Sequence, residues 1–247
     1  MYKNGHIYTT VIKPKLLVIY IRDTIIKGVK IIKNDYDTIA WLKLENIFFN
    51  LNTDVFLAGV YLWRDGSPTY QFELFQTVNV NLFDILQNDV CNYQQLGKVF
   101  LMGDFNARVG QKKDYIACDS VNVFTDDVNY SPDNVLNRCT TDNVSNSHGL
   151  KLIDLCISTS IRIANGRLHN DKTGACTFFN FNGSSLIDYL LLSEHDFKLI
   201  SKFNIDPLCE WSDHCSLSIC LSLTDYLHSY SNPDGAAVFN NGLICEL

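Results

Sequence analysis

The sequence predicts an α+β fold in which mostly antiparallel sheets pack together under a cover of helices. Apolar strand-like segments outnumber helical patterns, and they come in runs instead of alternating one for one with helices. The 247 residues are 47% hydrophobic, which is enough to form one buried core. We therefore expect one domain over residues 16–223, between an unmatched segment 1–15 and a turn-rich tail 224–247.

Short segments rich in Ile, Val, Leu and Tyr fill the first half of the chain. Strands are expected at 16–22, 28–32, 38–44 and 55–62, and the Asn and Asp residues between them favour an antiparallel meander. Further strands are expected at 98–102, 161–164, 176–179, 186–192, 203–205 and 215–221.

Helical spacing of apolar residues occurs in two places. Phe72, Phe75, Val78 and Leu82 predict an amphipathic helix over 70–87, and a second helix opens at His148. The polar stretch 111–147 between them has no sustained period, so we expect a long surface loop with few apolar contacts beside the functional site.

Charge and composition exclude several classes of protein. The net charge of −7 is the wrong sign for binding nucleic acid by bulk charge, although a cation held by carboxylates reverses the sign locally. No apolar stretch approaches the ~20 residues of a membrane span. The nine cysteines form no CxxC pair, and no signal peptide precedes them. These features predict reduced thiols and an intracellular protein, in the nucleus or cytoplasm and not secreted.

Asp104 and Asn106 stand two residues apart where the strand 98–102 ends, so both side chains project from the same side. A carboxylate can deprotonate water, and an amide beside it can donate to a phosphate oxygen. Taken alone, the pair is more typical of an Asx turn that ends a strand.

A second polar group consists of Asp213 and His214, next to another apolar strand, and Asp188 within the apolar strand 186–192. A buried carboxylate needs a partner, and the His214 ring is the candidate. Such a carboxylate would orient the imidazole and raise its pKa, so that the ring donates to a developing negative charge. A structural ion pair is the alternative. Serine-hydrolase, Walker A, dinucleotide-binding and structural-zinc motifs are absent from the sequence.

Together these motifs resemble the endonuclease/exonuclease/phosphatase superfamily. The matching motifs, each at a strand end, are Gly-Asp-Phe-Asn at 103–106, Leu-Ile-Asp-Tyr at 186–189 and Ser-Asp-His at 212–214. Within it the chain is most similar to the endonuclease domain of LINE-type (non-LTR) retrotransposons, through residues 106–110, 146–152 and 176–179. The resemblance extends from residue 16 to residue 221.

The resemblance implies a four-layer α/β/β/α sandwich of two mostly antiparallel sheets flanked by helices, here without its first strands. It implies an enzyme that hydrolyses phosphodiesters of DNA with Mg²⁺ or Mn²⁺. It also implies a reverse transcriptase domain as a partner in a longer polyprotein. The oligomeric state stays open.

The resemblance also implies roles for individual residues. Asp104 would orient and deprotonate the attacking water, and Asn106 would hydrogen-bond the phosphate. His214 would donate to the scissile phosphate, oriented by Asp188, and Asp213 would bind the metal. The remaining candidates are Tyr61, a strand-end tyrosine that reaches the phosphate, and the substrate-binding residues Thr177 and Asn146.

One departure from the family concerns the metal. The family's early strand with an Asn ligand and the next strand, ending in Gln-Glu, have no match here, and we therefore expect an N-terminally truncated domain with weakened or absent activity. Glu45 is the other carboxylate considered for the metal. The alternatives to a DNA endonuclease are a phosphatase of the same fold acting on lipid or inositol phosphates, and a non-catalytic remnant or binding module.

Overall fold

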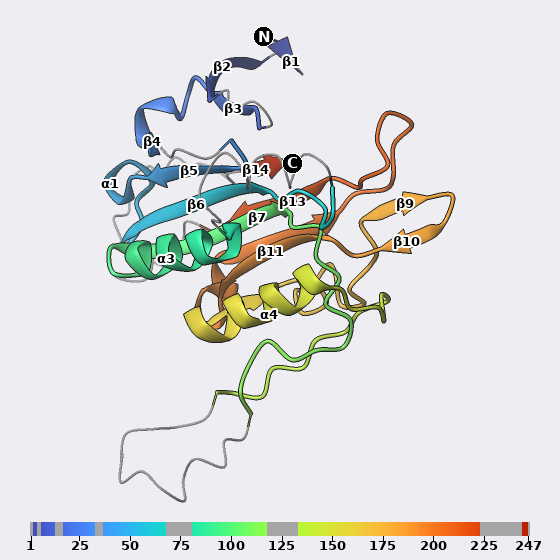
Figure 1. Cartoon of the computed structure of the whole chain (residues 1–247). Coiled ribbons are helices and arrows are strands. Elements are labelled where there is room, and N and C mark those ends of the chain that lie inside the picture. Colours follow the sequence, from blue (N-terminus) through green and yellow to red (C-terminus); the bar gives the residue numbers. More distant parts are fainter. Residues whose placement is uncertain are drawn as a thin grey trace, which may run out of the picture.

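The computed structural model describes residues 17–32, 37–67, 81–117 and 133–222, together with the backbone of residues 2–3, 6–12 and 244–246 (Figure 1). At its centre is a six-stranded sheet in the order β4-β5-β6-β7-β11-β8. Its strands are β4 (Val29–Ile32), β5 (Ile39–Leu44), β6 (Asp54–Tyr61), β7 (Gly97–Asp104), β11 (Asp188–Ser193) and β8 (Ile161–Ile163). Strands β6 and β7 are parallel, and the other neighbours in this sheet are antiparallel.

The other described strands lie in three smaller sheets. The first has the order β1-β2-β3, the second pairs β9 with β10, and the third has the order β12-β13-β14. Their bounds are β1 Tyr2–Lys3, β2 His6–Ile12, β3 Ile19–Arg22, β9 Phe178–Asn180, β10 Gly183–Ser185, β12 Ile200–Ile205, β13 Leu217–Leu221 and β14 Ile244–Glu246. Of the tail 224–247, the structure describes only β14, which pairs with β13.

Two long helices, α3 (Leu82–Gln94) and α4 (Ser147–Thr159), contact each other on one face of the six-stranded sheet (Figure 1). Each begins at an asparagine that caps it: the Asn81 side chain accepts from the Phe83 N–H, and Asn146 accepts from Gly149. The shorter helices are α1 (Asn46–Phe49), η1 (Ile26–Gly28) and η3 (Glu194–Leu199).

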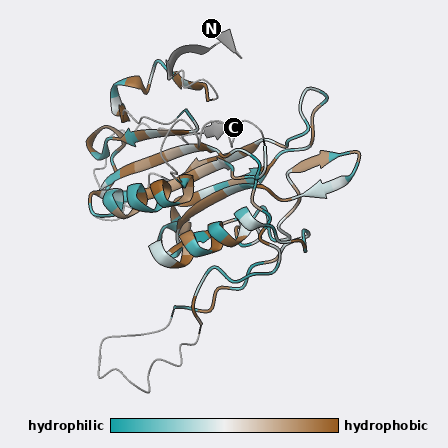
Figure 2. Ribbon diagram, viewed as in Figure 1, coloured by the Kyte–Doolittle hydropathy of each residue, from teal (hydrophilic) through white to brown (hydrophobic). Residues whose placement is uncertain are grey.

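The strands of the central sheet other than the edge strand β4 are buried on both faces. In β7, Val99 and Leu101 pack against the helices, whereas Phe100 and Met102 pack toward the β12-β13 side. This alternation follows from the two-residue period of a strand. It explains why the sequence of the central strands is hydrophobic almost without interruption, as Figure 2 shows along β7 and β11. The helices α3 and α4, the six-stranded sheet and the sheet that contains β12 and β13 therefore form three successive layers.

This architecture confirms the predicted α+β class with mostly antiparallel sheets. The fourth layer, helices on the outer face of the smaller sheet, is not formed by α3 or α4, and the described residues contain no other helix longer than six residues. None of the described helices is long and apolar enough to cross a membrane. The cysteines that the structure describes (91, 139, 156, 176, 209, 215 and 220) are free thiols.

The boundaries of the first predicted helix are wrong. The described helix begins at Leu82 and extends to Gln94, beyond the expected end at residue 87; residues 70–80 of the prediction lie outside the described part of the chain. The apolar residues that face the sheet are Phe83, Leu86 and Val90, a three-to-four-residue spacing displaced toward the C-terminus.

The loop prediction for 111–147 is also wrong at its base. Residues 118–132 lie outside the described part, but Asp114 and Tyr115 before them and Asp142 after them are buried. Asp114 accepts two hydrogen bonds from Arg167, at 2.6 and 2.7 Å. Both flanks of the loop therefore belong to the packed body of the protein.

Candidate active site

Three neighbouring strands carry polar side chains in one row across the sheet. Tyr61, the last residue of β6, is the register partner of Asp104, the last residue of β7. Asp104 is in turn the partner of Asp188, the first residue of β11. Directly paired residues point to the same face of a sheet, so the three side chains lie side by side.

The turn after β7 fixes the Asp104 carboxylate. Its Oδ1 accepts from the backbone N–H of Asn106 at 2.7 Å, and its Oδ2 accepts from the Asn106 amide nitrogen at 2.9 Å. The same amide nitrogen donates to the Leu62 carbonyl at 2.8 Å. Asn106 has a left-handed backbone (φ 47°), which asparagine tolerates better than most residues. The Asx turn is therefore present, and the Asn106 amide holds Asp104 in it. The contact of Asn106 with a phosphate stays a prediction.

His214 lies against Asp188. Its Nδ1 is 3.0 Å and 3.1 Å from the two carboxylate oxygens. The ring also packs on Phe178, with the ring centroids 4.8 Å apart, and the backbones of these two residues form an antiparallel bridge. Because Nδ1 is engaged by Asp188, Nε2 is the nitrogen that can face a ligand.

The electrostatics of the row are dominated by crowded negative charge. Burial, and then the charge of Asp188, raises the pKa of Asp104 to about 7. The hydrogen bond to Asp188 is the largest cause that raises the pKa of His214 above its ordinary value. Burial, followed by the charge of Asp104, raises the pKa of the Tyr61 phenol. The raised pKa of His214 favours its protonated form, and a pKa of about 7 lets Asp104 exchange a proton at neutral pH.

Oxygen and nitrogen atoms of Asp104, Asp188 and His214 lie within 4.8 Å of one another, close enough to share a metal ion. Crowding that raises a carboxyl pKa is relieved when a cation binds, so these residues fit a divalent cation held by one or two carboxylates and by waters. Asp213, the predicted metal ligand, is exposed and lies outside this group, although its charge acts on both Asp104 and His214.

Glu45 does not approach the site. It follows β5, whose last residue Leu44 pairs with Val55 at the start of β6, whereas Tyr61 ends β6. Its carboxylate forms an ion pair with Lys30. It lies at the opposite end of the sheet, so the alternative that it fills the metal site is wrong.

The side chains of the two predicted substrate-binding residues form hydrogen bonds with backbone groups in this structure. Thr177 is fully buried, and its hydroxyl oxygen accepts from the N–H groups of Ile187 at 3.2 Å and Asp188 at 3.1 Å. Asn146 caps α4 and donates to the Asn106 carbonyl at 3.0 Å. Both residues therefore fix the backbone around the site, and their contact with substrate stays a prediction.

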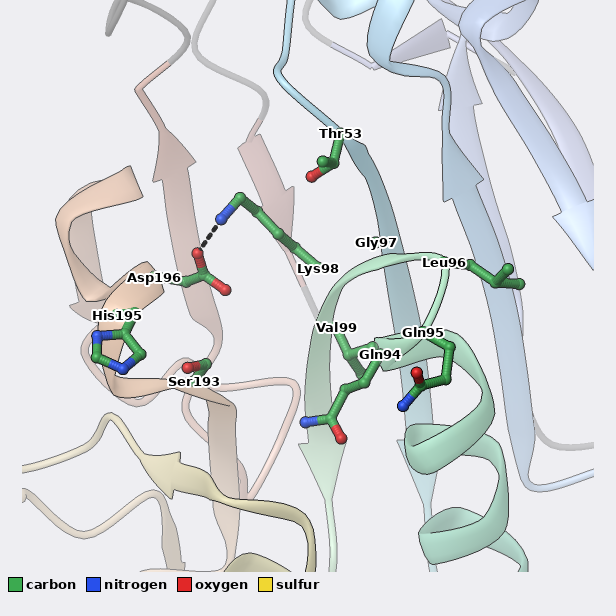
Figure 3. A pocket seen from close by; sticks show the side chains of 10 residues that line it. All are labelled: Thr53, Gln94, Gln95, Leu96, Gly97, Lys98, Val99, Ser193, His195 and Asp196. Carbon is green, nitrogen blue, oxygen red and sulfur yellow. Dashed lines mark hydrogen bonds and ion pairs between the residues drawn. The ribbon is translucent and has the colours of Figure 1, made fainter. Parts of the chain in front are cut away.

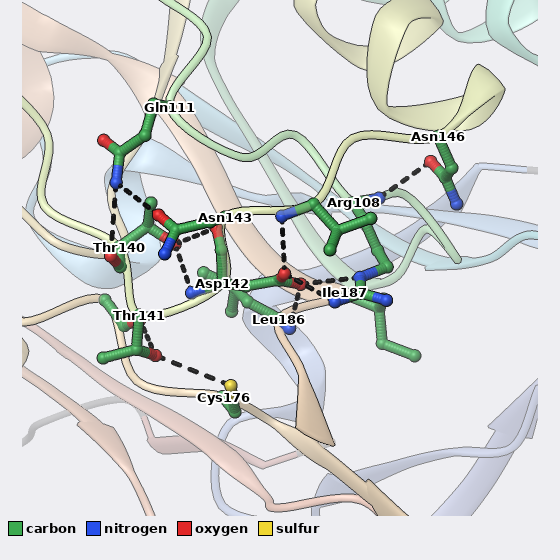
Figure 4. A network of polar contacts seen from close by, with 12 residues as sticks. Arg108, Gln111, Thr140, Thr141, Asp142, Asn143, Asn146, Cys176, Leu186 and Ile187 are labelled. Carbon is green, nitrogen blue, oxygen red and sulfur yellow. Dashed lines mark hydrogen bonds and ion pairs between the residues drawn. The ribbon is translucent and has the colours of Figure 1, made fainter. Parts of the chain in front are cut away.

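Two residues that sequence reasoning missed are Arg108 and Asp142, which link the two sides of the site (Figure 4). Arg108 lies in a motif already noted for its resemblance. Asp142 lies in a polar stretch, and only its burial distinguishes it from its neighbours.

A separate hollow of about 520 Å³ lies at the opposite end of the sheet (Figure 3). It is lined by residues at the start of β7 and the end of β11, and Lys98 and Asp196 form an ion pair there. Asp104 is at the other end of β7, so this hollow is not part of the candidate active site.

No protein-family model and no curated protein matches the chain. Among solved structures, the chain is similar to AP endonuclease LMAP from Leishmania major (TM-score 0.53, 10% identity), over 81% of this chain and 64% of that one. It is also similar to the 3′ phosphatase NExo from Neisseria bound to a product DNA hairpin (TM-score 0.48, 14% identity, 79% and 71% covered). A third similar structure is the endonuclease domain of TRAS1, a telomere-specific non-LTR retrotransposon (TM-score 0.47, 13% identity, 79% and 68% covered). The chain thus has the fold of the exonuclease/endonuclease/phosphatase proteins, as the likeness to LMAP shows.

Proposed function

We propose that the chain is a metal-dependent phosphodiester hydrolase that cleaves DNA, an endonuclease of the retrotransposon type. One observation carries the proposal: Tyr61, Asp104 and Asp188 occupy paired positions on three neighbouring strands, and His214 is bound to Asp188. A proton acceptor and a charged proton donor thus meet at one sheet edge, as hydrolysis of a phosphodiester requires.

In the proposed reaction, Asp104 accepts the proton of the attacking water. Its two oxygens are each held by Asn106, so the carboxylate is oriented before substrate binds. The pKa of Asp104 near 7 suits a group that takes up a proton at neutral pH.

His214 acts on the other side of the phosphate. Asp188 holds Nδ1, so the protonated ring presents Nε2–H to a phosphate oxygen that gains negative charge. The Tyr61 hydroxyl, next to Asp104 in the row, is placed to donate to the same phosphate.

The cation would lie beside Asp104 and Asp188, the carboxylates that the structure brings together, and the exposed Asp213, whose charge acts on Asp104, is the further ligand that the resemblance implies. A bound Mg²⁺ or Mn²⁺ would supply a Lewis acid for the phosphate oxygens and offset the acidity of the site. Since the family's principal glutamate has no match in the sequence, we expect weak cation binding and slow turnover.

DNA is the proposed substrate for two reasons. The residue motifs at 106–110, 146–152 and 176–179 resemble those of retrotransposon endonucleases. LMAP, which shares the fold, is named as an AP endonuclease. The net charge of −7 implies that attraction of the polyanion is confined to the site.

Nicking of supercoiled plasmid with and without Mg²⁺ or Mn²⁺ tests the proposal. We expect slow, cation-dependent nicking that is lost in both Asp104→Asn and His214→Ala, because each removes a proton-transfer group worth about 10²–10⁴-fold. The control is Asp154→Asn on the exposed side of α4, which should nick as the wild type does.

A parallel panel of inositol phosphates and bis-nitrophenyl phosphate separates the alternatives. Hydrolysis of the inositol phosphates without nicking would replace the endonuclease by a phosphatase. No hydrolysis of any substrate would contradict the enzymatic proposal and leave a binding module.

A further inference from the structure

Among the described residues, no strand pairs with the backbone at Asp188 on the edge opposite β7. Strand β11 pairs with β7 from residue 188 to residue 192, whereas β8 pairs with β11 only from 191 to 193. The N–H groups before that point bond to side chains instead. Thr177 accepts from Ile187 and Asp188, and Asn165 accepts from Leu190 at 3.0 Å.

Asp142 supplies the first of these side-chain acceptors. Its Oδ2 accepts from the Leu186 N–H at 3.1 Å, two residues before Asp188. Its Oδ1 accepts from the Val144 N–H at 3.0 Å. The side chain is 3% exposed, so the carboxylate is enclosed by its donors.

Arg108 neutralises this buried carboxylate in a two-pronged contact. Its Nε donates to Asp142 Oδ2 at 2.8 Å, and its Nη2 donates to Oδ1 at 2.6 Å (Figure 4). A paired arrangement of this kind fixes geometry as well as charge. Burial alone would raise the pKa of Asp142, but the hydrogen bonds from Arg108 and the backbone hold it below its ordinary value.

Arg108 belongs to the turn that carries the other half of the site. It follows Asn106 by two residues, and its backbone exchanges hydrogen bonds with Asn146 at the start of α4, at 2.9 Å each. The contact is so close that a Cβ on Gly149 would lie 1.8 Å from the Arg108 carbonyl oxygen. The turn is therefore fixed to the helix at one end of Arg108 and to Asp142 at the other.

We propose that the Arg108–Asp142 ion pair is a positioning element that sets the distance between Asp104 and the Asp188–His214 pair. It joins the turn after β7 to the segment before Asp188 through one carboxylate. Its effect on turnover rests on the proposed function, but its effect on geometry does not. A displacement of about 1 Å in a reacting group can cost about 10²-fold in rate.

The variant that tests the proposal is Asp142→Ala. If this variant does not fold, Arg108→Ala and Asp142→Asn take its place. Nuclear magnetic resonance of the whole chain follows the His214 Nδ1–H proton, which reports its hydrogen bond to Asp188, and amide exchange at residues 186–188. We expect the Nδ1–H resonance to shift or broaden and the three amides to exchange faster. Where hydrolysis is measurable, kcat should fall about 10²-fold with little change in KM.

The matched control is Asp196→Ala. Asp196 is also buried and paired with a cation, Lys98, but at the far end of β7. It should lower the Tm while the His214 resonance, the amide exchange at 186–188 and kcat stay unchanged.

An unchanged His214 resonance in Asp142→Ala would overturn the proposal, and so would equal changes in Asp196→Ala. If the wild-type protein hydrolyses nothing, the proposed function fails, but the resonance and exchange comparisons still decide the positioning role.

Discussion

Replacing Asp114 by alanine should destabilise the protein strongly, although the residue lies in a stretch that looks like a surface loop. Its side chain is fully buried and accepts from Arg167 and from the Ile163 N–H at 2.8 Å. Arg167 is itself 3% exposed, and its remaining acceptors are the carbonyls of Ile163 and Leu136. Asp114→Ala therefore leaves a buried guanidinium without its counter-charge and an N–H without an acceptor.

Removing one partner of a buried ion pair costs about 3–5 kcal/mol, of which the orphaned N–H accounts for about 1–3 kcal/mol. For a chain of this size each kcal/mol lowers the Tm by about 2–4 °C, so the expected drop is about 6–20 °C. Urea unfolding and calorimetry measure it. Asp154→Ala on the exposed side of α4 is the control and should change stability by less than about 0.5 kcal/mol.

Because of the same ion pair, we expect the free energy of unfolding to depend on pH. Hydrogen bonds and the charge of Arg167 outweigh burial and hold the pKa of Asp114 below its ordinary value. Its contribution is therefore present above the unfolded-state pKa and disappears as the pH falls through the lower folded-state pKa. Between pH 5 and pH 2 the wild type should lose more stability than Asp114→Ala. A cost below about 1 kcal/mol at pH 7, or parallel pH curves, would refute the reasoning.

Three further outcomes are expected. Gly103→Ala should lower the free energy of unfolding by at least about 2 kcal/mol, because Gly103 has a φ of +152° and an added Cβ would lie 1.9 Å from a backbone oxygen of β6. Gly66→Ala should lower it by about 1 kcal/mol, because its φ is +76° but no atom lies within 4 Å of the added Cβ. Asn146→Ala should lower the free energy of unfolding by about 1–2 kcal/mol by uncapping α4. Asn146→Asp keeps the acceptor for Gly149 but loses the amide that donates to the Asn106 carbonyl, so it should recover only part of that loss, and no recovery would contradict the cap. In Asp188→Asn, the His214 ring should titrate at lower pH than in the wild type by nuclear magnetic resonance, and an unchanged titration would show that Asp188 does not set the pKa of His214.

Local sequence pattern was sufficient for the elements that position the site. The apolar run before Asp104 predicted a strand at 98–102, and β7 covers it from Gly97 to Asp104. The roles that the resemblance implies require Tyr61, Asp104, Asn106, Asp188, Asp213 and His214 to reach one phosphate. The structure places all of them except the exposed Asp213 at one end of the sheet.

Contacts between distant residues were beyond that kind of reasoning. Asp114 and Asp142 stand in polar segments, and their burial depends on arginines 53 and 34 residues away in the sequence. Hydrophobic periodicity in the sequence cannot predict such an ion pair, because the pair forms only when the base of the loop folds onto the sheet. The start of α3 was misplaced for a related reason, since the cap at Asn81 competes with an apolar spacing that continues on its N-terminal side.

The parallel contact between β6 and β7 affects when the row of Tyr61, Asp104 and Asp188 can form during folding. Antiparallel neighbours can form from a short turn, but two parallel strands need a longer connection, which here contains α3. Tyr61 and Asp104 are 43 residues apart, and Asp104 and Asp188 are 84 residues apart. Closing such long loops slows folding, so the row assembles among the last pairings, and hydrolytic activity in a refolding experiment should appear after most of the helical signal has returned.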